Sequence, residues 1–346
     1  MYNTAWKMNG NKILSVTSGV VLVFLVGLIL RLAKPVFFPF FLAIFFYFVL
    51  SPALDFMTRL RIPRALALAL IVVIAFSSLY LLGILFYSSA KGFVASFPQY
   101  GEKISRLLNS LSEKLRLGGA SINPWTWTDG LDVNRIASFL LSSLNQFLAL
   151  FSSLVLIFVL LIFMLAGRGK LPVKVEKSFS AARAAKINQV IENIDGQVQK
   201  YLVIKTAISA ISGLIAGTVL ALFGVDFAIV FGFLTFILNF IPSLGSIIAI
   251  SFSALVAAFQ FGRFWPALWI FIILVSTDLL MANFIEPKWM GQGLGLSPLA
   301  VLFSLFFWGW LWGIPGMILA VPFMAIIKII CDNIPSLQFV AELISK

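Results

Sequence analysis

The sequence contains no histidine, a single cysteine (Cys331) and few charged residues, which make up 11% of its 346 residues. The absence of histidine excludes Ser-His-Asp and Cys-His nucleophiles and histidine-ligated zinc or haem. A lone cysteine excludes a disulfide within the chain. What remains must work with carboxylates, amides, hydroxyls and backbone groups, and an aspartyl mechanism would need a second deep acid beside Asp278. We predict no catalytic residue, no metal site and no cofactor, and a protein that is not an enzyme.

Apolar residues are what the sequence has in excess, since 61% are hydrophobic and the mean hydropathy is +1.06. Soluble domains are nearer half apolar and a quarter charged, so this excess is too large for one buried core. It is typical of a chain that crosses a membrane several times. We predict an all-α polytopic membrane protein with about eight helical membrane segments.

Basic residues outnumber acidic ones, 25 to 13, which gives a formal charge of +12. They flank apolar runs: one cluster at 59–64 follows the second run, and another at 168–186 follows the fourth. Cytoplasmic loops of membrane proteins carry such an excess of lysine and arginine. We expect both clusters and both termini in the cytoplasm, and no nucleic-acid partner. The first apolar run lacks a cleavage site and is interpreted as an uncleaved span.

The alternation of apolar and polar stretches predicts how the chain is organised. We expect three N-terminal spans in 1–87, an extracytoplasmic amphipathic segment at 88–146, a fourth span at 147–167, a basic cytoplasmic amphipathic connection at 168–202, a C-terminal membrane core at 203–331 and a tail at 332–346. The 88–146 segment is the longest polar stretch, and its apolar residues recur at helical spacing. It predicts a small helical extracytoplasmic domain.

Two apolar stretches of the core, 225–262 and 297–331, are each broken by proline and glycine. The first arm of each has about fifteen residues, which makes ~22 Å of helix against ~30 Å of hydrocarbon. We interpret them as re-entrant hairpins, and two ordinary spanning hairpins with tight turns are the alternative. One span lies between them, so the hairpins would enter from opposite faces. Paired broken helices of this kind indicate the binding site of a transporter.

The candidate site residues are those at the two breaks, where exposed backbone groups need a cavity or protein partners. They are Asn239, Pro242, Ser243, Gly245 and Ser246 in the first hairpin and Gly313, Pro315 and Gly316 in the second.

Charged residues are scarce between Thr206 and Ile327, and Asp278 lies deep in the span between the hairpins. A carboxylate at this depth costs several kcal/mol, so we interpret it as a functional residue for proton or cation coupling. A structural hydrogen bond or a residual ion pair is the alternative. Asn283 and Glu286 follow toward the cytoplasmic end and are further candidate polar or coupling residues. For Glu286 the simplest expectation is an interfacial ion pair with Lys288.

Three stretches, 239–245, 283–298 and 307–322, resemble the signatures of the autoinducer-2 exporter family. The first reads Asn-Phe-Ile-Pro-Ser-Leu-Gly, and the third contains Gly-Ile-Pro-Gly. Ser243 and Ser246 depart from the family pattern, which often has an aromatic residue and a proline there. The resemblance implies a bacterial inner-membrane transporter that forms homo-oligomers, with pentamers the family's form. It also implies export of autoinducer-2, a quorum-sensing signal, or sodium or lithium/proton antiport.

The leading hypothesis is a secondary transporter that exports a small polar solute such as autoinducer-2. No nucleotide-binding loop is present, because Gly169-Lys170 is followed by a leucine. Na⁺(Li⁺)/H⁺ antiport is the alternative and would need Asp278 to titrate in the working pH range. A membrane scaffold without transport is the alternative from another class. The expected partners are a small-molecule or ion substrate, the lipid bilayer and further copies of the chain.

Overall fold

The structure, a computed structural model, describes residues 25, 27–116, 153–291 and 294–345. Within these ranges it consists of helices, and no strand occurs there apart from an isolated bridge between Leu296 and Ser345. Six of these helices are long and apolar enough to cross a membrane. The prediction of an all-α polytopic membrane protein is confirmed. Part of the predicted extracytoplasmic domain, residues 117–146, lies outside the described residues.

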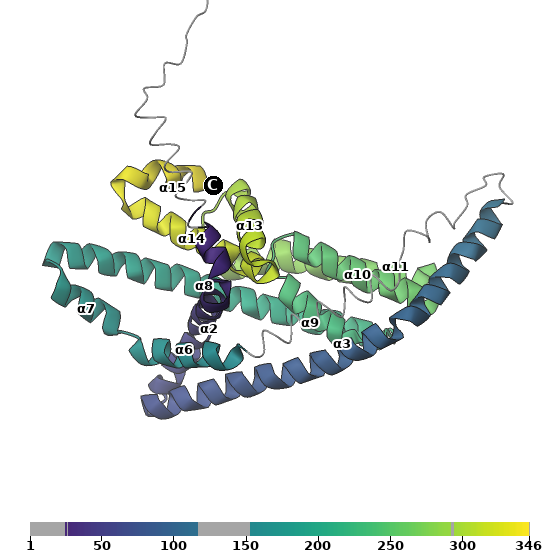
Figure 1. Cartoon of the computed structure of the whole chain (residues 1–346), viewed down its shortest axis with the longest axis horizontal. Coiled ribbons are helices and arrows are strands. Elements are labelled where there is room, and N and C mark those ends of the chain that lie inside the picture. Colours follow the sequence, from purple (N-terminus) through teal and green to yellow (C-terminus); the bar gives the residue numbers. More distant parts are fainter. Residues whose placement is uncertain (1–24, 26, 117–152, 292–293, 346) are drawn as a thin grey trace, which may run out of the picture.

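An N-terminal group of helices packs around a shared apolar core (Figure 1). It comprises α2 (Lys34–Arg59), α3 (Arg64–Arg116) and α6 (Leu154–Gly167). Fully buried alanines at 43 and 67 let α2 and α3 pack closely, and Leu161 of α6 fills the space between them. The tight turn from α2 to α3 contains Arg61, whose φ is 63°.

The chain then bends by 63° from α6 into α7 (Lys170–Ser178). After α7, a single helix, α8 (Ala181–Leu222), runs along the length of the bundle (Figure 1). Its first half is basic and amphipathic, and its second half is apolar. The predicted boundaries at 87/88 and 202/203 therefore lie inside α3 and α8. These helices continue because neither point carries a proline to end them.

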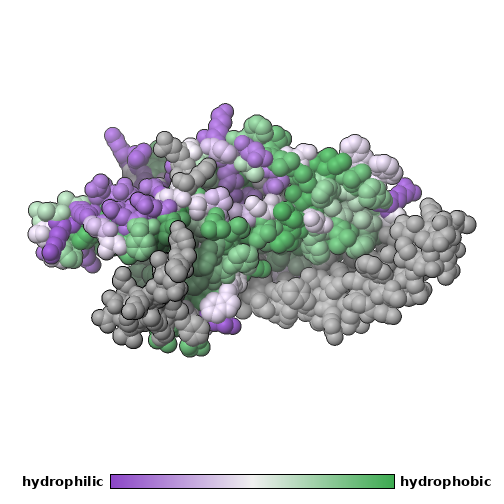
Figure 2. Space-filling model, turned by 90° about the horizontal axis from the view of Figure 1, so that it is seen from above, coloured by the Kyte–Doolittle hydropathy of each residue, from purple (hydrophilic) through white to green (hydrophobic). Residues whose placement is uncertain are grey.

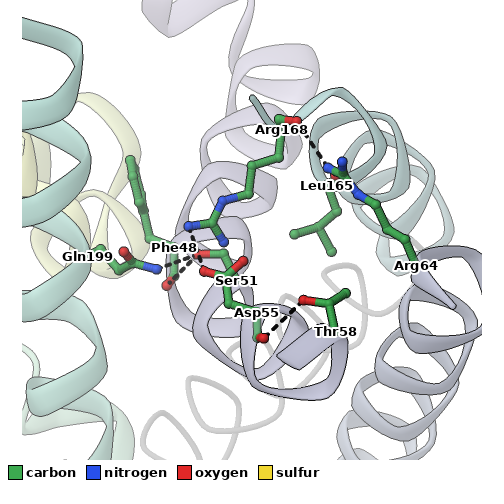
Figure 3. A network of polar contacts seen from close by, with 8 residues as sticks. All are labelled: Phe48, Ser51, Asp55, Thr58, Arg64, Leu165, Arg168 and Gln199. Carbon is green, nitrogen blue, oxygen red and sulfur yellow. Dashed lines mark hydrogen bonds and ion pairs between the residues drawn. The ribbon is translucent and has the colours of Figure 1, made fainter. Parts of the chain in front are cut away.

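Polar contacts join the N-terminal helices at the end of the bundle that carries the basic residues (Figure 3). The guanidinium of Arg64 donates to the carbonyls of Leu165 and Arg168 at 3.2 and 3.0 Å. These carbonyls lie at the C-terminal end of α6, where the regular helical hydrogen bonds stop and the Leu165 carbonyl accepts only a long bond, at 3.3 Å, from the N–H of Arg168. Arg64 therefore caps the helix. The guanidinium of Arg168 in turn forms an ion pair with Asp55 of α2 at 3.0 Å.

The same network continues from α2 to α8 (Figure 3). Pro52 lacks the N–H that would bond to the carbonyl of Phe48 in a regular helix. The hydroxyl of Ser51 donates to this carbonyl instead, at 3.4 Å, and accepts a hydrogen bond from Gln199 of α8 at 2.5 Å. A proline in α2 is thus compensated by a contact that also fixes α8.

Two hairpins follow α8, and each has one short arm and one long arm. They comprise α9 (Ala228–Leu238) with α10 (Leu244–Phe261), and α13 (Pro298–Trp312) with α14 (Ile314–Asn333). The short arms have 11 and 15 residues, or ~16 and ~22 Å, which is less than the hydrocarbon thickness. The long arms, α10 and α14, are among the candidate spans.

Between the hairpins, residues Phe264–Met290 form one apolar span of 27 residues. It consists of α11 (Phe264–Leu280), a π turn (Met281–Ile285) and α12 (Glu286–Met290). A π turn rotates the helix after it, and such turns are frequent at functional sites. Here the π turn separates Asp278 from Glu286.

The C-terminal tail docks on the start of the second hairpin. It contains a 3₁₀ turn (Pro335–Leu337) and α15 (Gln338–Ile344). The backbone N–H of Ser297 donates to the carbonyl of Ile344 at 2.8 Å. Cys331, at the end of α14, is buried.

Candidate functional site

The tip of the first hairpin is a point where two helix backbones touch. Gly245, in the first turn of α10, lies against the carbonyl of Leu238, and a Cβ at this position would overlap the carbonyl oxygen. Ser243 has φ 61° and ψ −46°, and the N–H of Leu244 bonds to the carbonyl of Pro242 at 2.6 Å. This is the rare, strained form of γ-turn. The turn therefore requires glycine at 245 and holds Ser243 in a strained conformation.

The tip of the second hairpin repeats the backbone contact. Gly316, in the first turn of α14, lies against the carbonyl of Trp308, which a Cβ would overlap. Gly313 takes the positive φ of this turn, 74°. The hydroxyl of Ser304 donates to the carbonyl of Ala320 at 2.7 Å and ties the two arms together.

Close packing between α8 and α9 brings the first tip to the span of α8. A Cβ at Gly213 would lie 2.7 Å from the Gly232 carbonyl oxygen, and one at Gly232 would lie 2.8 Å from that of Gly213. Small residues of this kind let two helix backbones approach. As a result, the amide of Asn239 donates to the hydroxyl of Ser209 on α8 at 3.1 Å.

A buried ion pair joins α8 to the start of α12. The ammonium of Lys205 lies 2.9 Å from both carboxylate oxygens of Glu286. Lys205 is only 5% exposed. The expectation that Glu286 pairs with Lys288 was wrong, because the π turn and the packing of α12 against α8 direct Glu286 inward. Lys288 is exposed.

Asp278 completes this polar cluster from α11. Its carboxylate lies beside the hydroxyl of Ser246 in the first turn of α10, and it is within electrostatic range of Lys205 and Glu286. Half-buried groups from α8, α10, α11 and α12 therefore meet beside the first tip. Among the described residues, no three His, Cys, Asp or Glu side chains lie close enough together to hold a metal ion.

The face of α8 toward this cluster carries further hydroxyls. Lys205, Ser209 and Ser212 share one face of the helix by its 3.6-residue repeat. Ser212 is 7% exposed, and its hydroxyl has no hydrogen-bond partner. The Thr206 hydroxyl, one position from Lys205, is also buried without a partner. A buried hydroxyl without a partner is available for a ligand or a water molecule.

The structure brings only some of the predicted site residues together. Asn239, Ser246, Asp278 and Glu286 meet at the cluster. Asn283 does not, because it is exposed and donates to the carbonyl of Leu279 in its own helix at 3.0 Å. Gly313, Pro315 and Gly316 belong to the second tip, whose surroundings are aromatic.

These aromatic surroundings are a packed core. Trp312 is fully buried, and its ring contacts those of Phe41 and Trp308 at centroid distances of 5.1 Å. Its indole N–H donates to the carbonyl of Leu30 at 3.2 Å. Trp310 is exposed, with the guanidinium of Arg31 5.2 Å above its ring. Trp312 is thus unavailable for stacking on a solute.

Sequence reasoning missed Lys205, the residue that neutralises Glu286. A signal for it was present in the apolar stripe Ile194, Val198 and Tyr201, which continues at i+4 to Lys205. A lysine on the buried stripe of a membrane helix needs a carboxylate partner. The sequence could not indicate which carboxylate, because Glu286 is 81 positions away.

Comparison with known proteins identifies the family of the chain. The family model "AI-2E family transporter" matches residues 19–336. The AI-2 transport protein TqsA of Escherichia coli K12 is 35% identical over 338 residues, covering 98% of this chain and 96% of that protein. Putative transport proteins of Borreliella burgdorferi and Haemophilus influenzae are each 32% identical, covering 89% and 91% of this chain and 84% and 91% of those proteins. This multi-pass membrane protein therefore belongs to the AI-2E family of transporters.

Proposed function

We propose that this protein is a secondary transporter that exports a small polar solute, with autoinducer-2 as the first candidate, and that it catalyses no reaction. The name of its E. coli relative, an AI-2 transport protein, supports the candidate solute. The sequence has no nucleotide-binding loop to supply energy. Flux would therefore follow the gradient of the solute or of a coupled ion.

The observation that carries this proposal is the buried polar cluster beside the first hairpin tip. Lys205 and Glu286 form an ion pair there, and the carboxylate of Asp278 lies beside the hydroxyl of Ser246. Charged groups in membrane spans are costly, and they mark substrate and ion pathways. A polyhydroxylated solute can form hydrogen bonds with the Ser246 hydroxyl and the Asn239 amide in place of their present contacts within the protein. The tip would then be released from these contacts, and solute binding would favour a different tip position.

The distribution of charge supports a cytoplasmic location for the end that carries α7. This end lies on the left in Figures 1 and 2. Figure 2 shows hydrophilic residues gathered there and a largely hydrophobic surface toward α10 and α11. Basic loops stay on the cytoplasmic side of bacterial inner membranes. We accordingly propose that the basic end lies in the cytoplasm and, from the distribution of lysine and arginine along the sequence, that both termini do as well.

Release of autoinducer-2 from loaded liposomes that contain the purified protein tests the proposal. We expect release above that of protein-free liposomes. Ser246→Ala should slow it about tenfold, the effect of losing one hydrogen bond between the Ser246 hydroxyl and the solute. Ser253→Ala is the matched control, because Ser253 is buried on the same helix and bonds only to the carbonyl of Ala249, at 2.7 Å.

Each result has a separate meaning. No release by the wild-type protein would exclude autoinducer-2 as the solute. If Ser246→Ala and Ser253→Ala slow the release equally, the transport site does not lie at the polar cluster.

The second candidate is sodium or lithium/proton antiport, which the same cluster favours because two carboxylates lie beside one ammonium group. In this case Asp278 would exchange a proton for the cation. Liposomes with a pH-reporting dye should then show sodium-dependent proton movement that Asp278→Asn abolishes. Asp332→Asn is the control, since Asp332 is exposed and lies 3.9 Å from Lys328, outside the polar cluster. Proton movement that persists in Asp278→Asn would argue against this candidate.

We also propose a homo-oligomer, with a pentamer suggested by the family resemblance. Native mass spectrometry of the detergent-purified protein measures the number of copies directly. A monomer that transports would show that one copy contains the complete pathway.

A further inference from the structure

A long apolar cavity lies between the N-terminal helices and the two hairpins. Its volume is about 570 Å³, which is within the range of small-molecule sites. Residues from Phe38 to Met57 of α2 line it, so it extends along ~28 Å of this helix, close to the ~30 Å of the hydrocarbon layer. Its other walls include Ile71 to Leu82 of α3, Phe240 near the first tip and Pro315 at the second.

The chemistry of this cavity suits an alkyl chain. Ser78 and Thr206 are the only polar side chains among its lining residues. An apolar cavity does not hold ordered water, because water there finds too few partners. Ile74 and Leu82, which line the cavity, are 62% and 45% exposed. The cavity is therefore accessible from the bilayer, whose chains can fill it with dispersion contacts.

Positive charge gathers where the cavity reaches the end of α2. Met57 lines the cavity, and Arg59 and Arg61 follow it in the turn to α3. Both are exposed, and neither is paired with a carboxylate in the part of the chain that the structure describes. Arg64 and Arg168, in contrast, are engaged in the network of Figure 3. Arg61 adopts φ 63°, which asparagine and glycine tolerate better.

We propose that this cavity binds an anionic phospholipid from the leaflet at the basic end of the bundle. One acyl chain lies between α2 and α3, and the phosphate lies at Arg59 and Arg61. Basic residues next to apolar membrane helices recognise anionic headgroups in this way. The chain would reach the side chains of Phe240 and Pro315, so it fills the space between the N-terminal helices and the hairpin tips.

Native mass spectrometry of the full-length protein tests the proposal. The protein is exchanged into phosphatidylglycerol or phosphatidylethanolamine with identical acyl chains, and the lipid retained after partial delipidation is counted. Ala75→Phe fills the cavity, since Ala75 lines it. Ala69→Phe is the matched control, because Ala69 is exposed on the same helix and does not line the cavity. Arg59→Gln and Arg61→Asn each remove one positive charge. Asparagine at position 61 tolerates the positive φ of the turn.

We expect the wild-type protein and Ala69→Phe to retain one phosphatidylglycerol per protomer in preference to phosphatidylethanolamine. Ala75→Phe should lose it, and each arginine variant should weaken the preference about fivefold. Circular dichroism checks helix content, and Ser78→Leu replaces Ala75→Phe if the latter does not fold. Equal retention by the wild-type and cavity-filled proteins, or no preference for phosphatidylglycerol, would overturn the proposal.

Discussion

The two broken hairpins share one backbone plan and differ in the side chains around their tips. In each, a glycine in the first turn of the long arm lies against a carbonyl of the short arm: Gly245 on Leu238 and Gly316 on Trp308. Neither glycine can carry a Cβ without moving a helix. The plan therefore determines where each tip lies, independently of what surrounds it.

The surroundings are opposite in character. The first tip is hydrogen-bonded to α8 through Asn239, and its Ser246 lies beside Asp278 of α11, next to the Lys205–Glu286 pair. The second tip packs among aromatic rings, of which Trp312 is fully buried. Among the described residues, the charged groups near a tip gather at the first. Under the proposed function the two similar hairpins would have different roles, and variants can test this.

The largest expected effect comes from breaking the buried ion pair, which has no counterpart at the second tip. Glu286→Gln leaves the Lys205 ammonium buried without its charge partner and should cost about 3 kcal/mol of stability. Lys205→Met should cost less, because Glu286 is partly exposed. The double variant Lys205→Met/Glu286→Gln should recover most of the loss. Thermal unfolding in detergent measures this, and Asp332→Asn, which changes the exposed partner of a 3.9 Å pair, should change little.

The next effect tests the shared backbone plan. Gly245→Ala and Gly316→Ala each force a methyl group into a carbonyl, so both should destabilise the protein by about 2 kcal/mol. Gly196→Ala is the control, because nothing lies within 4 Å of a Cβ there. It should stabilise α8 slightly, since alanine favours a helix. A lower melting temperature for only one of the two tip variants would show that the tips are not equivalent.

A smaller effect separates polar chemistry from packing. Asn239→Ala and Ser304→Ala each remove one interhelical hydrogen bond and should cost about 1 kcal/mol. Only Asn239→Ala should also slow solute release from liposomes, because Ser304 is tied to Ala320 within the second hairpin. Equal slowing by both variants would contradict the assignment of transport chemistry to the first tip.

The smallest expected effect concerns the strained turn of the first hairpin. Ser243→Gly puts a glycine at the positive φ of this turn, as Gly313 does in the second hairpin. Relief of the strained φ should exceed the entropy cost of glycine, for a gain of ~0.5 kcal/mol. A melting temperature that falls instead would show that the Ser243 side chain makes a necessary contact.

Local features made much of this architecture predictable. The lengths of the apolar runs predicted the long apolar helices that the structure describes, and the proline and glycine breaks predicted both hairpins. Both signals come from residues that are neighbours in the sequence, so they need no knowledge of the packing. The interpretation of Asp278 and Glu286 as polar site residues also came from a local property, charge in an apolar span. The partner of Glu286 could not be predicted, because Lys205 approaches it only when α12 packs on α8.

The sequence by itself determined the class of the protein, its helical segments, its family and the basic end of its bundle. The physical reason is that the hydropathy and charge of a segment depend on its own residues and not on the segments that pack against it. The tertiary structure alone decided which tip is polar, which carboxylate Lys205 neutralises and where the apolar cavity lies. These features arise between residues far apart in the chain, such as Asn239 with Ser209 and Lys205 with Glu286, and such contacts follow from packing geometry.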